Sequence, residues 1–204
     1  MRITDIRYDG GKNRFIVETE GPRFFLSYET YDRYKLKKDL DISEWIEIFE
    51  NESLLMEARE YVYGLVARRA VSSHEVEQKL QRRNIPKEIR AQVLAFFFDA
   101  KLIDDGAYLQ AAVQDQIQIK GFGPWRIVSN LRQKGFDKTE VLQVYHSLTS
   151  LEEESQRARD FFEKRWPQIR AKTPAHKKKK MSDQLLRQGF SYDTVSGVME
   201  GIDE

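Results

Sequence analysis

A short motif that ends a helix occurs three times in this sequence and constrains the fold more than any other feature. It consists of Leu, three further residues, and then Gly-Phe or a close variant. Its copies begin at Leu80, Leu131 and Leu185, which are 51 and 54 residues apart. Self-similarity at this spacing predicts one supersecondary unit that the chain uses three times.

The motif predicts a Schellman helix end. Gly is the residue best suited to the left-handed position that follows a helix, and Asn is the next best. With Gly135 in this position, Leu131 and Phe136 fall at the two places that touch through an apolar contact. The equivalent residues are Leu80, Asn84 and Ile85 in the first copy, and Leu185, Gly189 and Phe190 in the third. Each copy therefore predicts a helix that ends with its own hydrophobic clasp.

Helix starts flank each copy of the motif. The helix that each motif ends begins at Ser72-x-x-Glu75, Gly123-Pro124 or Pro174. The next helix along the chain begins at Pro86, Asp137-x-x-Glu140 or Ser191. One more amphipathic helix precedes each helix that the motif ends. The apolar stripes of these preceding helices are Leu54, Leu55, Ala58, Tyr61, Val62, Leu65 and Val66; Ala107, Tyr108, Ala111 and Ala112; and Ala158, Phe161, Phe162 and Trp166. The pattern predicts nine helices over residues 53–202, arranged as three stacked three-helix bundles.

The first fifty residues differ from the repeats. Three strands are predicted at Ile3–Tyr8, Arg14–Thr19 and Arg23–Tyr28, separated by Asp9-Gly10-Gly11 and Gly21-Pro22 turns. Short helices are predicted over 28–34 and 43–50, the second with Ser43 as its cap. The expected fold is mainly α: three tandem three-helix repeats in an elongated curved array, after a small β-meander with short helices. The expected domains are residues 1–50, 53–102, 103–150 and 151–204.

The sequence lacks the residues that several classes of function require. There is no Cys, the three His residues are scattered, and no phosphate-binding Gly loop, His-Glu motif or Ser-His-Asp set occurs. Asp104 and Asp105 are a carboxylate pair, but Asp at a helix start is far more often a cap. We therefore expect no catalytic residues, no metal and no cofactor. The chain also lacks an 18-residue apolar run and a signal-peptide core, so we expect a cytoplasmic protein.

The formal net charge of +1 conceals a segregation of charge. Residues 41–60 carry seven acidic residues and one Arg. Basic clusters at 68–90, 120–135 and 165–190 carry net charges of +4, +4 and +7, and each covers the middle helix of its repeat. Stacked repeats would align these clusters into one positive stripe, which is typical of a polyanion-binding protein. Ordinary solvated helix faces are the alternative interpretation.

The candidate partner-binding residues are cations of these clusters and one Trp. They are Arg68, Arg69, Arg82, Arg83, Lys120, Trp125, Arg126, Arg132, Lys134, Lys177, Lys178, Lys179, Lys180 and Arg187. Cations in the last turn of a helix also complement its dipole, so this structural role stays open for most of them. Periodicity predicts that Arg126 is exposed, and local packing is the alternative role of Trp125. The run 177–180 covers all sides of a helix, so at least one Lys must face inward or extend along the surface.

Parts of the chain resemble the RecX family. The first repeat does so through Ala58, Tyr61, Leu65, Arg68, Ser72, Glu75, Val76 and Leu80, and the second through Ile103-Asp104-Asp105, Tyr108, Gly123-Pro124, Ile127, Leu131 and Gly135-Phe136. Lys35-Leu36-Lys37 and the acidic segment after it resemble an N-terminal extension of some members. Asn84-Ile85 departs from the usual family ending, and the third repeat is looser than the other two.

The resemblance implies a regulator that binds filaments of the RecA recombinase on DNA and inhibits extension, ATP hydrolysis and strand exchange. It also implies weak binding of single- or double-stranded DNA. We expect a monomer with no membrane partner. A stand-alone helical DNA-binding protein is the alternative, since a three-helix unit can present a recognition helix to the major groove. The middle helices, however, offer few side chains suited to base reading.

Overall fold

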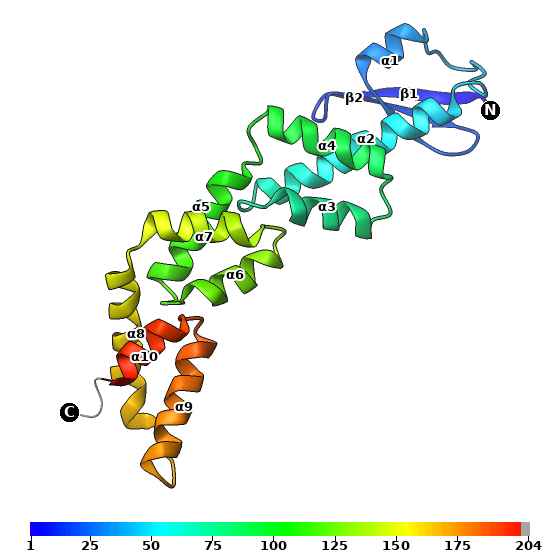
Figure 1. Cartoon of the computed structure of the whole chain (residues 1–204). Coiled ribbons are helices and arrows are strands. Elements are labelled where there is room, and N and C mark those ends of the chain that lie inside the picture. The colour runs from blue at the N-terminus through cyan, green and yellow to red at the C-terminus, as the bar shows by residue number, and fades with distance from the viewer. Residues whose placement is uncertain (201–204) are drawn as a thin grey trace. The chain divides into compact units, whose positions relative to one another are not determined.

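The structure is a computed structural model that describes residues 1–200. The chain divides into two compact units, Met1–Ile103 and the residues from Asp104 onward. Unit 1 holds a small sheet and the first three-helix repeat, and unit 2 holds the second and third repeats (Figure 1). The expected mainly helical fold with an N-terminal sheet is confirmed.

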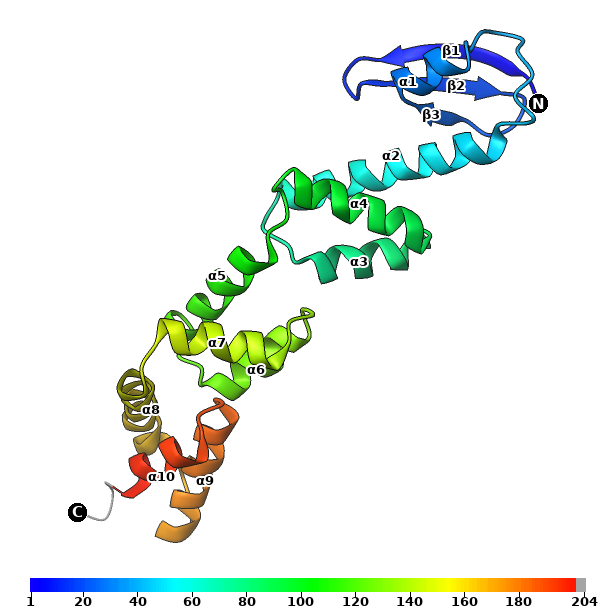
Figure 2. The same cartoon turned by 45° about the horizontal axis from the view of Figure 1, so that its top comes forward.

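Unit 1 begins with a three-stranded antiparallel sheet in the order β1–β2–β3 (Figure 2). Its strands are β1 (Ile3–Asp9), β2 (Arg14–Thr19) and β3 (Phe24–Leu26). Helix α1 (Tyr28–Arg33) follows and is capped by the hydroxyl of Ser27, which accepts from the backbone N–H of Thr30. These elements confirm the predicted meander and the first of the two predicted short helices.

Helix α2 (Ile46–Val66) runs unbroken from the sheet into the first repeat. In its first half Phe49 is buried in the core of the sheet, and the hydroxyl of Ser53 accepts from the backbone N–H of Phe25 at 2.8 Å. Its second half buries Ala58 and Val62 in the first repeat. A separate short helix over 43–50 is therefore a wrong prediction. No Gly or Pro lies between the two halves, so the helix propagates through the expected boundary.

Ser43 does not cap a helix but holds the carboxylate of Asp41. The backbone N–H and the hydroxyl of Ser43 donate to Asp41 Oδ1 at 3.0 and 2.6 Å. These two bonds, together with one from the N-terminal ammonium at 3.2 Å, lower the pKa of Asp41 to about 2 from its ordinary 3.8. The stability that they contribute is present above the ordinary pKa and is lost as the pH falls toward 2.

We expect Ser43→Ala to raise the pKa of Asp41 toward 3.8, because the hydroxyl donor is lost. A carbon-detected NMR titration of the Asp41 carboxyl measures this shift. The pKa of Asp137, whose carboxylate is held by Thr139 in unit 2, should stay unchanged and serves as the internal control. An Asp41 pKa that stays at about 2 in the variant would contradict the assignment.

The first repeat combines the second half of α2 with α3 (Ser73–Arg82) and α4 (Lys87–Asp99). Ser72 caps α3 as predicted, its hydroxyl accepting from the backbone N–H of Glu75 at 3.2 Å. Pro86 is the cap of α4 rather than its first helical residue. Arg90 on α4 donates to the carbonyl of Ile85 at 2.6 Å and to Glu77 at 2.7 Å, which ties α4 to the end of α3.

Unit 2 contains two repeats, each with its own core. The second repeat consists of α5 (Asp105–Gln118), α6 (Pro124–Arg132) and α7 (Lys138–Leu148). The third consists of α8 (Leu151–Arg165), the 3₁₀ turn η1 (Trp166–Gln168), α9 (Pro174–Arg187) and α10 (Tyr192–Glu200). The predicted three helices per repeat are confirmed within residues 1–200. Residues 201–204 of the expected third domain lie outside the described residues.

The predicted apolar stripe of α5 is only partly confirmed: Tyr108 stacks on Phe136 and Ala112 packs against the core, but the most deeply buried row is a different one. Its buried residues are Leu109, Val113 and Ile117, whereas Ala107 and Ala111 are exposed. Both rows have helical spacing, but Leu, Val and Ile each remove far more apolar surface from water than Ala does. Asp104 caps α5, its carboxylate accepting from the backbone N–H of Ala107 at 2.9 Å, so the capping role of this residue is confirmed.

All three helix stops have the predicted geometry. The left-handed residues Asn84, Gly135 and Gly189 have φ of 58°, 92° and 89°. In each stop the residue that follows donates its backbone N–H to the carbonyl of the motif Leu. These bonds are Ile85 to Leu80 at 3.2 Å, Phe136 to Leu131 at 3.2 Å and Phe190 to Leu185 at 3.4 Å. In each pair both residues belong to the same hydrophobic core.

The third stop is also the place where the two repeats of unit 2 meet. The backbone N–H groups of Gly123 and Trp125, at the start of α6, donate to the carbonyls of Gln188 and Gly189 at 2.9 and 3.0 Å. A Cβ on Gly123 would lie 2.4 Å from the Gly189 carbonyl carbon, and one on Gly189 would lie 2.2 Å from the Arg126 nitrogen. Gly123 is therefore required for the close approach of the two backbones, in addition to its place at the start of α6.

Candidate polyanion-binding groove

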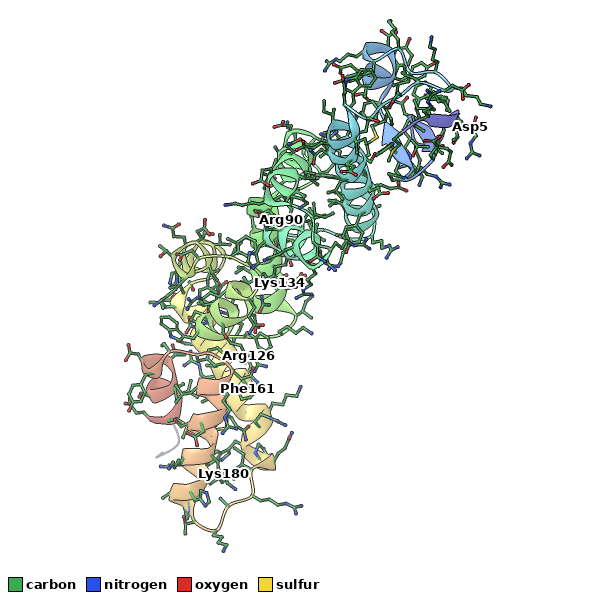
Figure 3. All side chains as sticks on the ribbon, turned by 90° about the vertical axis from the view of Figure 1, so that its right-hand side faces the viewer. Asp5, Arg90, Arg126, Lys134, Phe161 and Lys180 are labelled. Atoms are coloured by element: carbon green, nitrogen blue, oxygen red, sulfur yellow. The ribbon has the colours of Figure 1, made fainter. Side chains whose placement is uncertain are left out.

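Two adjoining hollows form a groove beside α9 in unit 2. The first, of about 260 Å³, lies between the end of α8, η1 and α9. The second, of about 280 Å³, lies between α6, α8 and α9. Arg165 and Gln184 line both hollows, so the two form one surface. Figure 3 marks Arg126, Phe161 and Lys180, in this order, along it.

The lining of this groove is strongly cationic. Its charged residues are Arg126, Arg165, Arg170, Lys180 and Arg187. No Asp or Glu lines either hollow, and no carboxylate within residues 1–200 forms an ion pair with any of these five side chains. Uncompensated positive charge along a groove raises the local concentration of anions and favours a polyanionic ligand.

Backbone carbonyls and amide side chains position these cations. Arg126 donates to the carbonyl of Arg187 and to Gln188 Oε1, both at 3.3 Å, and its guanidinium lies 4.1 Å from the centre of the Phe122 ring. Lys180 donates to the carbonyl of Arg170 at 3.1 Å, and Arg165 to Gln168 at 3.0 Å. All of these acceptors are neutral, so each contact orients a charge without cancelling it.

The prediction that Arg126 is exposed is wrong. Its side chain is half-buried, because the end of α9 covers the start of α6 at this point. The helical period shows which face of α6 points away from the core of its own repeat. It does not show that the third repeat packs on that face. Arg126 therefore also has a structural role, since it joins the two repeats.

The run Lys177–Lys180 surrounds α9, as predicted. Lys180 reaches the groove, and Lys177 lies over the Trp166 ring with its Nζ 4.2 Å from the ring centre. Lys178 and Lys179 lie beside a different hollow, toward α10. The run therefore does not act as one patch, and only part of it contributes to the groove.

The other candidates of unit 2 lie outside both hollows. Arg132 and Lys134 are exposed at the end of α6, and Lys120 is exposed after α5. Trp125 is 46% exposed, and the Nζ of Lys138 lies 4.7 Å from the centre of its ring. The Trp125 side chain is thus available to a partner while its backbone holds the third stop.

The candidates of unit 1 lie at the ends of α2 and α3. Arg68 and Arg69 follow α2, and Arg82 is exposed in the last turn of α3. Arg69 forms an ion pair with Glu75, and Arg83 stacks on the Tyr61 ring at 3.7 Å. Part of the basic cluster of the first repeat is therefore engaged within the repeat, in contrast to the groove of unit 2.

Two cations of the groove, Arg165 and Arg170, are not among the candidates predicted from the sequence. Arg165 ends α8, and Arg170 lies in the connection between η1 and α9. Both belong to the basic cluster of residues 165–190, so the charge count contained the signal. Their place in the groove depends on how α8 packs against α9, which no local pattern indicates.

The three-helix repeats match known family models in chain order. The models of the first, second and third three-helix domains of RecX match residues 58–97, 104–144 and 152–199. The chain is 25% identical over 203 residues to a regulatory protein RecX of Finegoldia magna, covering 97% of this chain and 98% of that protein. It is 26% identical over 182 residues to the protein of that name in Bacillus subtilis, covering 88% and 68%.

Solved structures share the fold. A crystal structure of regulatory protein RecX matches with a TM-score of 0.77 and 21% identity, over 98% of both chains. RecX from Lactobacillus salivarius matches with a TM-score of 0.65 and 22% identity, over 74% of this chain and 97% of that one. Since three consecutive RecX domains match this chain in their natural order, the protein belongs to the RecX family of regulatory proteins.

Proposed function

We propose that this protein binds filaments of the RecA recombinase on DNA and inhibits their activity, including ATP hydrolysis and strand exchange. It acts by binding, without catalysis or a cofactor, as a cytoplasmic monomer. Membership of a family of regulatory proteins supports the regulatory role. The observation that carries the proposal is the groove beside α9, whose five cations have no carboxylate partner within residues 1–200.

The groove fits the chemistry of a nucleoprotein filament. Such a filament presents DNA phosphates and acidic protein side chains, and Arg forms bidentate contacts with both groups. We propose that Arg165 and Arg187 make the central contacts, since both are exposed and neither side chain has a carboxylate partner in the described chain. Arg132, Lys134 and the outward Lys residues of α9 supply longer-range attraction.

The test compares two double variants that remove the same charge from the third repeat. Arg165→Gln with Arg187→Gln alters the groove, and Arg159→Gln with Lys164→Gln alters exposed positions of α8 that do not line it. We expect the groove variant to need about tenfold more protein for half-maximal inhibition of DNA-dependent ATP hydrolysis by RecA. The control variant should inhibit like the unchanged protein. Equal inhibition by both variants would contradict the proposal.

A titration of labelled DNA without the recombinase addresses the stand-alone DNA-binding alternative. Under the proposal, DNA alone binds weakly, and the groove variant lowers the slope of log K against log salt by about 1.4 on single strands. Co-sedimentation with RecA filaments should be much stronger than with DNA alone. Tight, sequence-selective binding to bare DNA would favour the alternative function.

A further inference from the structure

Another hollow, of different character, lies within unit 1. It has a volume of about 520 Å³ and lies between the β1–β2 turn and the neighbouring faces of α2 and α4. Lys12 and Arg14 line it from the hairpin, Arg59, Glu60 and Tyr63 from α2, and Phe96 from α4. The volume is within the range of small-ligand sites.

The ionic contacts in this hollow leave one positive charge uncompensated. Glu60 pairs with Lys12 and, at 3.2 Å, with Arg14, which also lies 3.8 Å from Asp9. Two carboxylates therefore balance two cations. Arg59 forms no ion pair with any carboxylate of the described residues.

Arg59 also has an unsatisfied donor. Its Nε is buried and has no hydrogen-bond partner within residues 1–200. Its guanidinium lies over the Phe96 ring, with Cζ 4.4 Å from the ring centre, and this contact holds the charged group beside the ring. A buried donor without an acceptor is unfavourable. Because Nε has almost no exposed surface, an anionic ligand would contact the terminal guanidinium nitrogens, which are neither buried nor hydrogen-bonded within residues 1–200. Arg59 is thus held ready for an anionic group.

An apolar wall stands beside this charge. The Tyr63 side chain is 44% exposed although it packs edge-on against Phe96 and Phe97, at 6.1 and 4.8 Å between ring centres. Met56 extends the same wall. The contacts with Phe96 and Phe97 keep the Tyr63 ring in place, so a ligand would not have to order it. Exposed aromatic surface next to an Arg is typical of the anchor points in protein interfaces.

We infer that this hollow binds an acidic peptide segment of a partner protein. One Asp or Glu carboxylate takes the donors of Arg59, and a neighbouring large apolar side chain packs on Tyr63 and Phe96. A single carboxylate fits better than a phosphate, because only one positive charge is uncompensated and Glu60 repels a second negative charge. This site lies in the other unit from the proposed filament-binding groove and does not depend on it.

The test uses labelled, terminally blocked octapeptides of Gly and Ser that carry one Phe-Glu pair, with fluorescence anisotropy on the full chain. We expect measurable binding that weakens about tenfold or more when Gln replaces Glu or when Ala replaces Phe in the peptide. Arg59→Gln should weaken it to the same extent. Glu60→Gln should strengthen binding about threefold, since it removes the competing negative charge. Arg33→Gln, an exposed change outside the hollow, should have no effect.

Arg59→Gln should weaken peptide binding and Glu60→Gln should strengthen it. If these residues had only a structural role, both variants would weaken binding, so the opposite effects identify a binding site. The peptide changes need no altered protein, so misfolding of Arg59→Gln would leave the test intact, and Arg59→Lys gives a milder protein variant. No binding of the Phe-Glu peptide at 1 mM would overturn the inference. Equal binding of the Glu and Gln peptides, or weaker binding by Glu60→Gln, would also overturn it. Arg59-dependent binding of an oligodeoxythymidine in preference to the peptide would assign the hollow to nucleic acid instead.

Discussion

Gly189→Ala should lower the free energy of unfolding of unit 2 by about 3 kcal/mol. The residue has φ of +89°, which costs an L side chain about 1–2 kcal/mol. Its added Cβ would also lie 2.2 Å from the Arg126 nitrogen, so the end of α9 would have to move away from α6. That movement breaks the hydrogen bonds from Gly123 and Trp125, each of which contributes about 1 kcal/mol.

Urea unfolding followed by Trp fluorescence measures this loss. The three Trp residues are Trp45, Trp125 and Trp166, so a Trp45→Phe background leaves signal from unit 2 alone. Gly197→Ala is the matched control, because Gly197 lies inside α10 with no atom within 4 Å of its added Cβ. This control should stabilise unit 2 by about 0.5–1 kcal/mol. If Gly189→Ala lowers the free energy of unfolding by less than about 1 kcal/mol, the end of α9 can move away from α6 at little cost and the prediction is wrong.

Glu154→Ala should destabilise unit 2 by a similar amount, about 2–6 kcal/mol, because each of two buried donors left without an acceptor costs about 1–3 kcal/mol. Glu154 is 2% exposed and accepts hydrogen bonds from the hydroxyls of Tyr145 at 2.9 Å and Thr194 at 3.0 Å. Arg157 donates to the Tyr145 oxygen at 2.8 Å. Burial, reinforced by the charge of Glu154, raises the pKa of Tyr145 well above its usual range, so its hydroxyl stays protonated and donates. Removing the carboxylate leaves the hydroxyls of Tyr145 and Thr194 without their acceptor.

The same Trp45→Phe background and urea assay test this second effect. Glu163→Ala, an exposed change on the same helix, should shift the free energy of unfolding by less than about 0.5 kcal/mol. Tyr145→Phe removes one hydroxyl and should cost less than Glu154→Ala, because the buried carboxylate then keeps Thr194 as a donor. If Glu154→Ala costs no more than Glu163→Ala, the buried network does not hold α7, α8 and α10 together.

The helix ends were predictable because they depend on a few neighbouring residues. The three stops, the caps of Ser72 and Asp104 and the capping box of Asp137 with Glu140 all occur as the sequence predicts. In each case the donor and its acceptor are separated by a few positions in the chain. Local rules therefore suffice to identify these helix ends and to count the repeats.

The candidate site was only partly predictable. The charge count identified the basic cluster of residues 165–190, which supplies four of the five groove cations, Arg165, Arg170, Lys180 and Arg187. The count could not show that Lys178 and Lys179 lie beside another hollow, or that Arg126 is half-buried. Arg126 meets Gln188, 62 residues later, and no periodicity reports on such a pair.

The sequence by itself determined that this protein consists of three-helix repeats with Schellman ends and that its cations cluster around the middle helices. Both properties follow from residue type and short spacing. Only the tertiary structure decided that α2 joins the sheet to the first repeat, that Leu109 rather than Ala107 is buried on α5, and that the third stop docks on α6. These features depend on burial between segments far apart in the chain, where the larger apolar surface and the closer backbone approach determine the packing.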